Sequence, residues 1–459
     1  MEEIESILNP SWTDLIRFEM KQLEEEGRDL SSLDKEAILK RVYLEGRLAA
    51  EEIWLLLQDL PLRPEYHYYE PSDFDEIRRV AHRRGETIEE HISENALRDK
   101  ILGGFIGRCA GNMLGKPVEL MSREEIKKRL KRLGLLKLRT YFPRKFFADE
   151  ELAILDRSRT TLEGINCVVR DDDIDYVLLN LKVVEKHGAS FSTADVGEEW
   201  LLNLPYKAVY TAERMAYRNL IEGLKPPETA LYLNPFREWI GAQIRADLWG
   251  YICPGKSELA TELAYRDAKL SHVKNGIYGE MMIAAMISRS FFEENILEII
   301  KAGLHEIPSR CRLRNAVEFV IELWKRGFSW EDAIEKILEK FSGYSPIHTI
   351  NNMAIVVAAL LWGEGDYGET IAKAVLSGLD TDCNGATVGS IIGVMKGYSN
   401  IKEENRRTWF RPLNNMLESI IPEFNKTKIT EVVDRIVRLA LRHSSFIDRS
   451  QTSSNFFSE

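Results

Sequence analysis

The sequence predicts an all-α fold, and three observations support this prediction. Strand signals are sparse, because few segments alternate apolar and polar residues and turn-bounded runs of β-branched residues are nearly absent. Helical periodicity is common instead: between Ile174 and Val184, apolar residues recur at spacings of three and four. Proline residues fall between such segments, as at Pro226-Pro227 and Pro254. These patterns are typical of a protein built from many helices.

Composition and charge exclude some classes of function. A hydrophobic share of 44% against 29% charged residues is close to that of soluble globular proteins, so a sizeable core is expected. The formal net charge of −11 argues against non-specific binding of nucleic acid, which requires basic patches. The concentrated basic stretch at residues 127–132 is more typical of the solvated face of a helix.

Cysteine usage and apolar runs indicate the compartment. The five cysteines are scattered and lack paired metal-ligand spacing, which suits a reducing cytoplasm rather than a disulfide framework. Residues 1–5 are acidic and lack the features of a signal peptide. The apolar run Met353–Trp362 is too short to span a bilayer and predicts a buried helix. We therefore expect a cytoplasmic protein with no membrane partner.

The chain divides into three predicted parts. Residues 1–95 are charged and rich in Leu and Glu, which predicts an N-terminal helical extension, with contacts in a homo-oligomer as one expected role. Residues 96–443 carry the helical periodicity and form the predicted catalytic domain. Residues 444–459 are polar and rich in Ser, which predicts a frayed tail. Within the domain, residues 129–165 lack clear periodicity and predict a loop or lid.

Two segments carry glycine at every fourth position. On a helix this spacing places the glycines on one narrow stripe. Each glycine inside a helix costs about 1 kcal/mol relative to alanine, so a neighbour that approaches the backbone closely is expected to offset that cost. We predict that both helices lie at the centre of the domain, near each other or near the ligand. The glycines are Gly103, Gly107, Gly111 and Gly115 in the first segment and Gly385, Gly389, Gly393 and Gly397 in the second.

A run of three carboxylates, Asp171-Asp172-Asp173, precedes an apolar helix. One interpretation is helix capping, because acidic side chains accept hydrogen bonds from free N–H groups at a helix start. Capping accounts for one or two acids. Three consecutive carboxylates repel one another, and in a partly buried setting their pKa values rise unless a cation intervenes. Spacing alone leaves both interpretations open.

A second acidic helix start contains Asp380 and Asp382 and leads into the second glycine stripe. Capping is again an alternative, but Asp-x-Asp also offers two hard oxygen ligands for Mg²⁺, Mn²⁺ or Ca²⁺. Two such starts, both next to segments predicted to be central, favour one shared cation site. Glu119 follows the first glycine stripe just beyond Pro117, where by itself it would be an exposed loop acid.

Five motifs in this order resemble the ADP-ribosylhydrolase (ADP-ribosylglycohydrolase) family, which includes the dinitrogenase reductase-activating glycohydrolase. The resemblance implies an orthogonal multi-helix bundle with a central Mg²⁺ or Mn²⁺ site of one or two ions. It also implies hydrolysis at the anomeric carbon of ADP-ribose. The motifs, between about residues 98 and 440, are Gly103–Glu119, Asp171–Asp173, Trp239–Arg245, Leu270–Glu280 and Gly378–Asp382.

The resemblance also implies a ligand set. The family's Thr-Asp-Asp-Thr corresponds to Asp171-Asp172-Asp173-Ile174, and its Asp-x-Asp-Thr to Asp380-Thr381-Asp382-Cys383. Two threonines are thus replaced by Asp171, which could still bind a metal, and by Cys383, whose soft sulfur is a poor partner for Mg²⁺. The ligands of a second ion are therefore the part of the site that departs from the family motifs. Asn112 stands where the family commonly has Asp. The implied metal ligands are Asp171, Asp172, Asp173, Asp380 and Asp382.

Catalytic roles follow from the chemistry of glycosidic cleavage. The reaction passes through an oxocarbenium-like state, which nearby carboxylates stabilise. A bound divalent cation orients ribose hydroxyls and lowers the pKa of a water molecule. One carboxylate beside the metal is expected to act as general base, and the candidates are Asp172 and Glu119.

Substrate contacts are predicted in the two central motifs. Gly241 and Arg245 could present N–H groups and a guanidinium to a diphosphate, or could form a tight helix junction with a surface arginine. His272 is either a structural histidine or, by the resemblance, a pocket residue. Trp239 and Tyr278 could stack an adenine or belong to the core.

The function predicted from the sequence is therefore a divalent-metal-dependent hydrolase that cleaves an N- or O-ribosyl bond in an ADP-ribose-like substrate, either a small molecule or linked to protein. One alternative is a non-catalytic ADP-ribose-binding relative, which the residues Ile174 and Cys383 keep open. Another is a hydrolase of a small ribosyl metabolite, since the extension and the predicted lid could exclude macromolecules.

Overall fold

The fold is all-α, as predicted. The computed structural model describes residues 6–7, 9–81, 88, 90–135, 137–154 and 156–454, with side chains up to residue 442. Among these residues the strands are the two-residue β1 (Met416–Leu417) and β2 (Thr427–Lys428), which pair antiparallel. Residues 1–5, whose acidic character argued against a signal peptide, lie outside the described residues.

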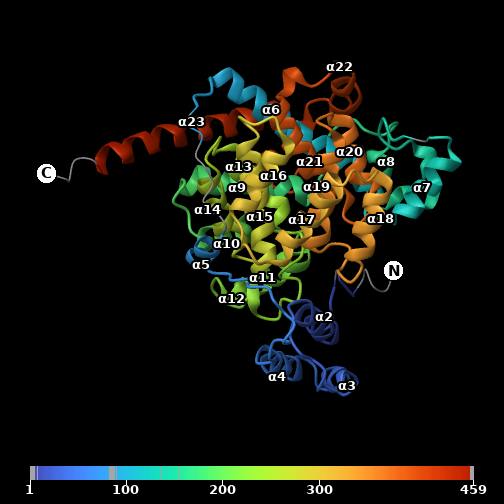
Figure 1. Ribbon diagram of the computed structural model, residues 1–459, viewed down its shortest axis with the longest axis vertical. Coiled ribbons are helices and arrows are strands. Elements are labelled where there is room, and N and C mark those ends of the chain that lie inside the picture. The colour runs from blue at the N-terminus through green and yellow to red at the C-terminus, as the bar shows by residue number, and fades with distance from the viewer. Residues whose placement is uncertain are drawn as a thin grey trace.

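The N-terminal extension is helical, with a small core of its own under the main body (Figure 1). Buried ion pairs join it to the domain: Arg237 pairs with Glu19 at 2.7 Å and with Glu26 at 2.8 Å, and Arg312 pairs with Glu70 at 2.7 Å. This part is therefore anchored through α2 and the segment around Glu70, while α3 and α4 project. The helices are α2 (Trp12–Glu25), α3 (Lys35–Glu45), α4 (Arg47–Gln58) and α5 (Phe74–Val80).

The projecting pair α3 and α4 exposes large apolar side chains. A monomeric soluble protein rarely exposes a contiguous apolar patch larger than a few hundred Å². Oligomer contacts of the extension, expected from the sequence, stay a prediction. The exposed side chains are Tyr43, Leu44, Leu48, Leu55 and Leu56.

The main domain begins with α6, close to the boundary predicted at residue 95. Its first half consists of α6 (Glu94–Gly115), α7 (Arg123–Arg132), α8 (Arg157–Thr160), α9 (Asp172–His187), α10 (Thr193–Asn203), α11 (Thr211–Ile221), α12 (Glu228–Leu231) and α13 (Asp247–Tyr251). Its second half consists of α14 (Ser257–Ala268), α15 (Lys274–Arg289), α16 (Ile296–His305), α17 (Arg312–Lys325), α18 (Trp330–Lys340), α19 (Thr349–Gly363), α20 (Tyr367–Leu376), α21 (Thr381–Lys396), α22 (Glu403–Asn405) and α23 (Ile429–Ser454).

Short helical turns connect these helices. They are η1 (Lys116–Val118), η2 (Arg144–Phe146), η3 (Asp149–Ala153), η4 (Tyr206–Ala208), η5 (Gln243–Arg245), η6 (Tyr398–Asn400), η7 (Arg406–Phe410), η8 (Arg411–Leu413) and η9 (Pro422–Phe424). The boundary predicted at residue 443 falls within α23, and residues 455–459 of the predicted tail lie outside the described residues. In the described part of the chain, no helix is both long and apolar enough to cross a membrane.

The two glycine-striped helices, α6 and α21, pack directly against each other at the centre of the domain, as predicted. They run antiparallel, so Gly107 faces Gly389 and Gly111 faces Gly385. A methyl group at Gly389 would lie 2.3 Å from the carbonyl oxygen of Gly107. The two backbones therefore touch, and no side chain fits between them. Gly397 is different, because it ends α21 with a positive φ of 72°.

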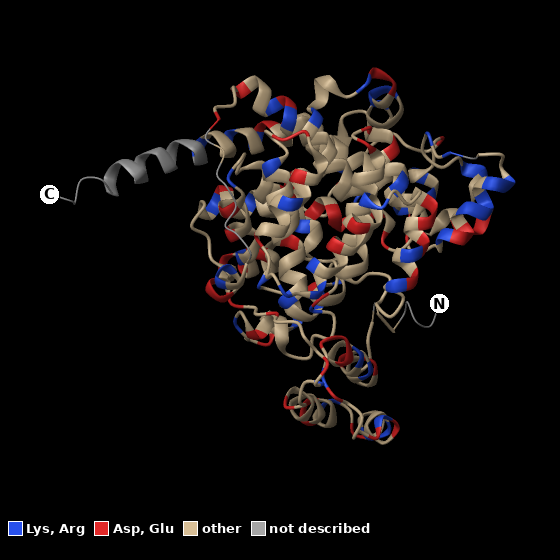
Figure 2. Cartoon of the chain, in the orientation of Figure 1, with Lys and Arg blue, Asp and Glu red and all other residues tan. Residues whose placement is uncertain are grey.

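The segment predicted as a loop or lid, residues 129–165, is mostly irregular in its described part, but it also contains the short helices η2, η3 and α8 and is attached to the core. Tyr141 and Phe146 are fully buried, and the Tyr141 hydroxyl donates to the carbonyl oxygen of Trp409 at 2.7 Å. Arg157 donates to the carbonyl oxygen of Pro117 at 2.8 Å. The basic stretch at 127–132 lies on α7, where Figure 2 shows Lys and Arg residues at the edge of the molecule, as expected for a solvated helix face.

Replacing Gly389 by alanine is expected to destabilise the protein by about 3 kcal/mol or more, because the added methyl group would force the two backbones apart. Urea unfolding measures the effect. Gly343→Ala is the matched control, because no heavy atom lies within 4 Å of a methyl group there. Equal unfolding midpoints for the two variants would contradict the glycine contact.

Candidate metal centre and active site

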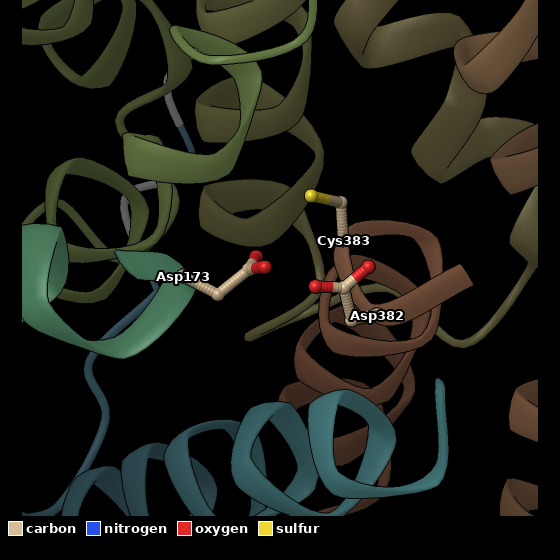
Figure 3. A group of neighbouring side chains, drawn as sticks. All are labelled: Asp173, Asp382 and Cys383. Atoms are coloured by element: carbon tan, nitrogen blue, oxygen red, sulfur yellow. The ribbon is translucent and has the colours of Figure 1, made fainter. Parts of the chain in front are cut away.

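The two acidic helix starts converge in space. Asp173 lies in the first turn of α9, and Asp382 and Cys383 lie in the first turn of α21. Their carboxylate oxygens and thiol sulfur lie within 4.8 Å of one another. Figure 3 shows the side chain of Asp173 pointing across the gap between the two helices toward Asp382. Residues more than two hundred positions apart in the chain therefore share one site.

Local backbone geometry explains how each start presents its acids. Asp171 is the N-cap of α9, and its Oδ1 accepts a hydrogen bond from the backbone N–H of Asp173 at 3.1 Å. Asp380 is the N-cap of α21, but its side chain makes no capping hydrogen bond. A tight turn with positive φ at Gly378 (75°) and Leu379 (61°) leads into it. Capping thus accounts for Asp171 and leaves Asp380 to another role.

Arg108 of α6 fixes the position of the α9 start. Its guanidinium is fully buried and donates to the carbonyl oxygen of Asp173 at 2.8 Å and to Asp173 Oδ1 at 2.9 Å. It also pairs with Asp247 at 2.8 Å. Because α6 contacts α21 through glycines and α9 through Arg108, one helix holds both acidic starts.

Lys116 and Glu119, at the end of α6, complete the cluster. The Lys116 ammonium donates to Oδ2 of Asp171. The carboxylates of Asp382 and Glu119 also act on Lys116. Although burial opposes it, these carboxylates hold the pKa of Lys116 above its ordinary value, and burial raises the pKa of Glu119 well above its own. The fold therefore brings six carboxylates together: Asp171, Asp172, Asp173, Asp380, Asp382 and Glu119.

The carboxylates of the cluster compete for few positive charges. Burial, reinforced by neighbouring carboxylates, raises the pKa values of Asp172, Asp173 and Asp380 well above the ordinary range. Asp171 is the exception: burial raises its pKa, but the Lys116 ammonium outweighs that effect and holds it below the ordinary value. Without additional positive charge, the charged forms of these acids are therefore disfavoured.

A divalent cation fits this donor set. Oδ1 of Asp382 is buried, and no N–H or hydroxyl group of the described residues donates to it. The carboxylate of Asp382 belongs to the group formed with Asp173 and Cys383. Carboxylate oxygens are the preferred ligands of Mg²⁺ and Mn²⁺, and a thiolate is tolerated better by Mn²⁺ than by Mg²⁺. Asp172 and Glu119 are half-buried, whereas Asp173, Asp380 and Asp382 are buried.

Arg245 corrects a prediction. It is fully buried rather than on the surface, and its guanidinium donates to Asp267 at 2.9 Å and to Glu213 at 2.8 Å, with Glu280 at 3.6 Å. It also donates to the hydroxyl of Ser271 at 3.1 Å. These acceptors engage most of the guanidinium N–H groups inside the core, so Arg245 is the centre of a buried ion network.

The other predicted substrate contacts are also buried. A methyl group at Gly241 would lie 2.1 Å from Glu213, so this glycine makes room for the network. His272 lies 2.8 Å from the hydroxyl of Ser271, and burial lowers its pKa well below the ordinary value. Tyr278 is fully buried and donates to the carbonyl oxygen of Pro71. The alternative interpretation, a tight structural junction, describes these residues.

The sequence interpretation missed two cationic residues of the site. Arg108 interrupts a stripe of glycine and small residues in a helix that is otherwise apolar there, and such a charge requires a buried partner. Lys116 lies in the motif Gly103–Glu119, but the sequence interpretation gave this lysine no role. Asn352 was also missed; its Oδ1 accepts from the backbone N–H of Asp380 at 3.2 Å and from Asn384 at 2.8 Å. No sequence periodicity predicts that Asn352 has this role.

Comparison with known proteins decides the family. The protein-family model for ADP-ribosylglycohydrolase matches residues 93–445, which include both acidic helix starts and both glycine stripes. The chain belongs to the ADP-ribosylglycohydrolase family. The match begins one residue before α6, so the N-terminal helices α2 to α5 lie outside the region that the family shares.

Two further comparisons accompany the family match. A solved structure described as an ADP-ribosylglycohydrolase-related protein complex is similar to this chain at 16% identity and a TM-score of 0.46. The similarity covers 75% of this chain and 99% of that chain. No curated protein matches the chain.

Arg245→Met is expected to destabilise the ADP-ribosylglycohydrolase domain by about 3–5 kcal/mol, because it leaves buried carboxylates without their counter-charge. Urea unfolding measures this. Lys182→Met, which removes half of an exposed ion pair with Glu423, is the control and should change stability by less than about 1 kcal/mol. A stable Arg245→Met variant that had lost only ligand affinity would restore the substrate-binding role.

Asp380→Asn is expected to stabilise the cation-free protein at pH 8 by about 1–3 kcal/mol, because it removes one buried unpaired charge. The pKa of Asp380 is higher in the folded than in the unfolded chain. The wild-type carboxyl therefore favours folding at low pH and loses that contribution as the pH rises through the raised pKa. Thermal unfolding in EDTA should show a smaller difference at pH 5 than at pH 8. A variant less stable than wild type at pH 8 would refute this account.

Proposed function

We propose that this chain is a divalent-cation-dependent hydrolase that cleaves an N- or O-ribosyl bond at the anomeric carbon of an ADP-ribose-like substrate. The observation that carries the proposal is the meeting of two acidic helix starts, those of α9 and α21, beside Glu119. The family's name supplies the substrate class. A purely structural domain gains nothing from six carboxylates in one place, since each buried acid costs stability unless it is paired.

The residues that would hold the cation are Asp172, Asp173, Asp380 and Asp382. Asp173 and Asp382 lie in one group with Cys383, and Asp380 is next to Asp382. Asp171, also proposed as a ligand from the sequence, has both oxygens engaged by the backbone of Asp173 and by the ammonium of Lys116. When bound, Mg²⁺ or Mn²⁺ would orient ribose hydroxyls and lower the pKa of a water molecule.

The chain's own acids account for the remaining chemistry. Cleavage breaks the bond between the anomeric carbon and the acceptor nitrogen or oxygen; the acceptor keeps the electron pair and takes up a proton from solvent. The surrounding carboxylates stabilise the positive charge left on the ribose ring. Water oxygen then bonds to the anomeric carbon, and its proton passes to a carboxylate. Asp172 and Glu119 are the candidates for this general base, because both are only partly buried whereas Asp173, Asp380 and Asp382 are buried.

The proposal is tested by incubating the chain with ADP-ribosyl-arginine and with an ADP-ribosylated protein, each with Mg²⁺, Mn²⁺ or EDTA. Chromatography then measures released ADP-ribose. We expect release that requires the cation. Release only from the small molecule would favour a hydrolase of ribosyl metabolites. Thermal stabilisation by ADP-ribose without release from either substrate would favour the non-catalytic alternative.

Asp382→Asn is expected to lower cation-dependent release by about 100-fold or more, because even loss of an outer partner of a metal site costs about 10- to 100-fold. Helix content by circular dichroism should be unchanged. Asp332→Asn, at the start of α18, is the control and should keep full activity, because the carboxylate of Asp332 is exposed and accepts a hydrogen bond from the hydroxyl of Ser329. Full activity in Asp382→Asn would rule out the proposed ligand.

A further inference from the structure

The acidic cluster has two places where positive charge is favoured. At the first, the ligand atoms of Asp173, Cys383 and Asp382 lie within 4.8 Å of one another. At the second, the ammonium of Lys116 is in contact with Asp171. The two places share Asp382, because its carboxylate also acts on Lys116. At one of the two places, a side chain of the protein, Lys116, therefore supplies the positive charge.

Lys116 is held firmly in this position. Its side chain is only 11% exposed, and its backbone N–H donates to the carbonyl oxygen of Asn112. The preceding residue, Gly115, is pressed against α21: a methyl group there would lie 2.1 Å from the carbonyl oxygen of Thr381. The hydroxyl of Thr381 donates back to the carbonyl oxygen of Gly115 at 2.8 Å. The base of the lysine side chain is therefore fixed relative to the second acidic helix start.

An ammonium and a divalent cation exclude each other at this place. Lysine carries a compact point charge without acceptor atoms, so it cannot act as a ligand while it is protonated. A divalent ion bound to Asp171 would have to displace the ammonium from its contact and would then face a like charge in a buried site. The buried Oδ1 of Asp382, by contrast, has no N–H or hydroxyl donor among the described residues.

We infer that the Lys116 ammonium takes the place of one divalent cation, so that this chain binds a single Mg²⁺ or Mn²⁺ ion on the side of Asp382 that faces Asp173 and Cys383. The inference rests on the proposed function, and it specifies the number of ions in that centre. Lys116 is thereby a positioning residue: it neutralises Asp171 permanently and leaves the other acids to the ion. The two substitutions in the family motifs then lie at different places: Asp171 pairs with the ammonium, and Cys383 belongs to the group proposed to hold the ion.

The experiment counts bound Mn²⁺ by equilibrium dialysis and records its electron paramagnetic resonance spectrum. The wild-type chain should bind one ion per chain, with the spectrum of an isolated ion. Lys116→Met keeps the length of the side chain and removes its charge, so it should bind two ions. Two ions about 3.5–4 Å apart are magnetically coupled, which the spectrum distinguishes from two isolated ions.

Two variants serve as controls. Lys116→Arg keeps the positive charge and should bind one ion. Lys100→Met removes a partly buried lysine of the same helix, which donates to the carbonyl oxygens of Val394 and Met395, and should also bind one ion. These controls separate a general effect of altering α6 from the effect of the charge at residue 116.

Each outcome is informative. Two ions in the wild-type chain, or one ion in a folded Lys116→Met variant, would overturn the inference while leaving cation dependence intact. No bound ion in the wild-type chain would overturn the proposed function itself, and this inference with it. If Lys116→Met fails to fold, Asp171→Asn removes the partner of the ammonium instead: it should still bind one ion, and loss of that ion would place the cation at Asp171 and refute the assignment.

Discussion

The direct backbone contact between α6 and α21 is the constraint on which the rest of the site depends. Glycine at every fourth position lets the two antiparallel helices approach until the carbonyl oxygen of one meets the α-carbon of the other, as at Gly107 and Gly389. This contact fixes not only the distance between the helices but also their register, because each glycine has one partner. The register in turn places the end of α6 beside the start of α21. Lys116 and Asp382 therefore meet without any long side chain having to reach across a gap.

Electrostatic balance explains why the cluster needs partners of several kinds. The guanidinium of Arg108 pairs with Asp173 but also with Asp247, so it neutralises less than one full negative charge of the cluster. Lys116 compensates Asp171. The remaining carboxylates, such as Asp172 and Asp380, have raised pKa values, so a further positive charge nearby would stabilise their charged forms. Fixed cations of the protein thus hold the site together, and a bound ion is proposed to supply the rest.

Much of the fold was predictable from the sequence, because its signals are local or periodic. Glycine spacing predicted the central pair of helices. Clustered carboxylates predicted the shared site, since neighbouring carboxylates repel one another unless a cation compensates them. The sequence did not reveal that Arg245 is buried, because an arginine near a glycine has the same pattern whether it binds phosphate or carboxylates, and its partners Glu213 and Asp267 are not adjacent to it in sequence. Lys116 escaped notice similarly. Its role appears only when the end of one helix is placed against the start of another.

The chain between Glu119 and Asp171 leaves the site and returns to it, and both of its ends are held there by α6. Its aromatic side chains Tyr141 and Phe146 are fully buried in the main core. Truncating a buried phenylalanine typically costs about 3–5 kcal/mol, so this segment cannot be shortened without a loss of stability. The connection between the two parts of the site is therefore also part of the core that supports them.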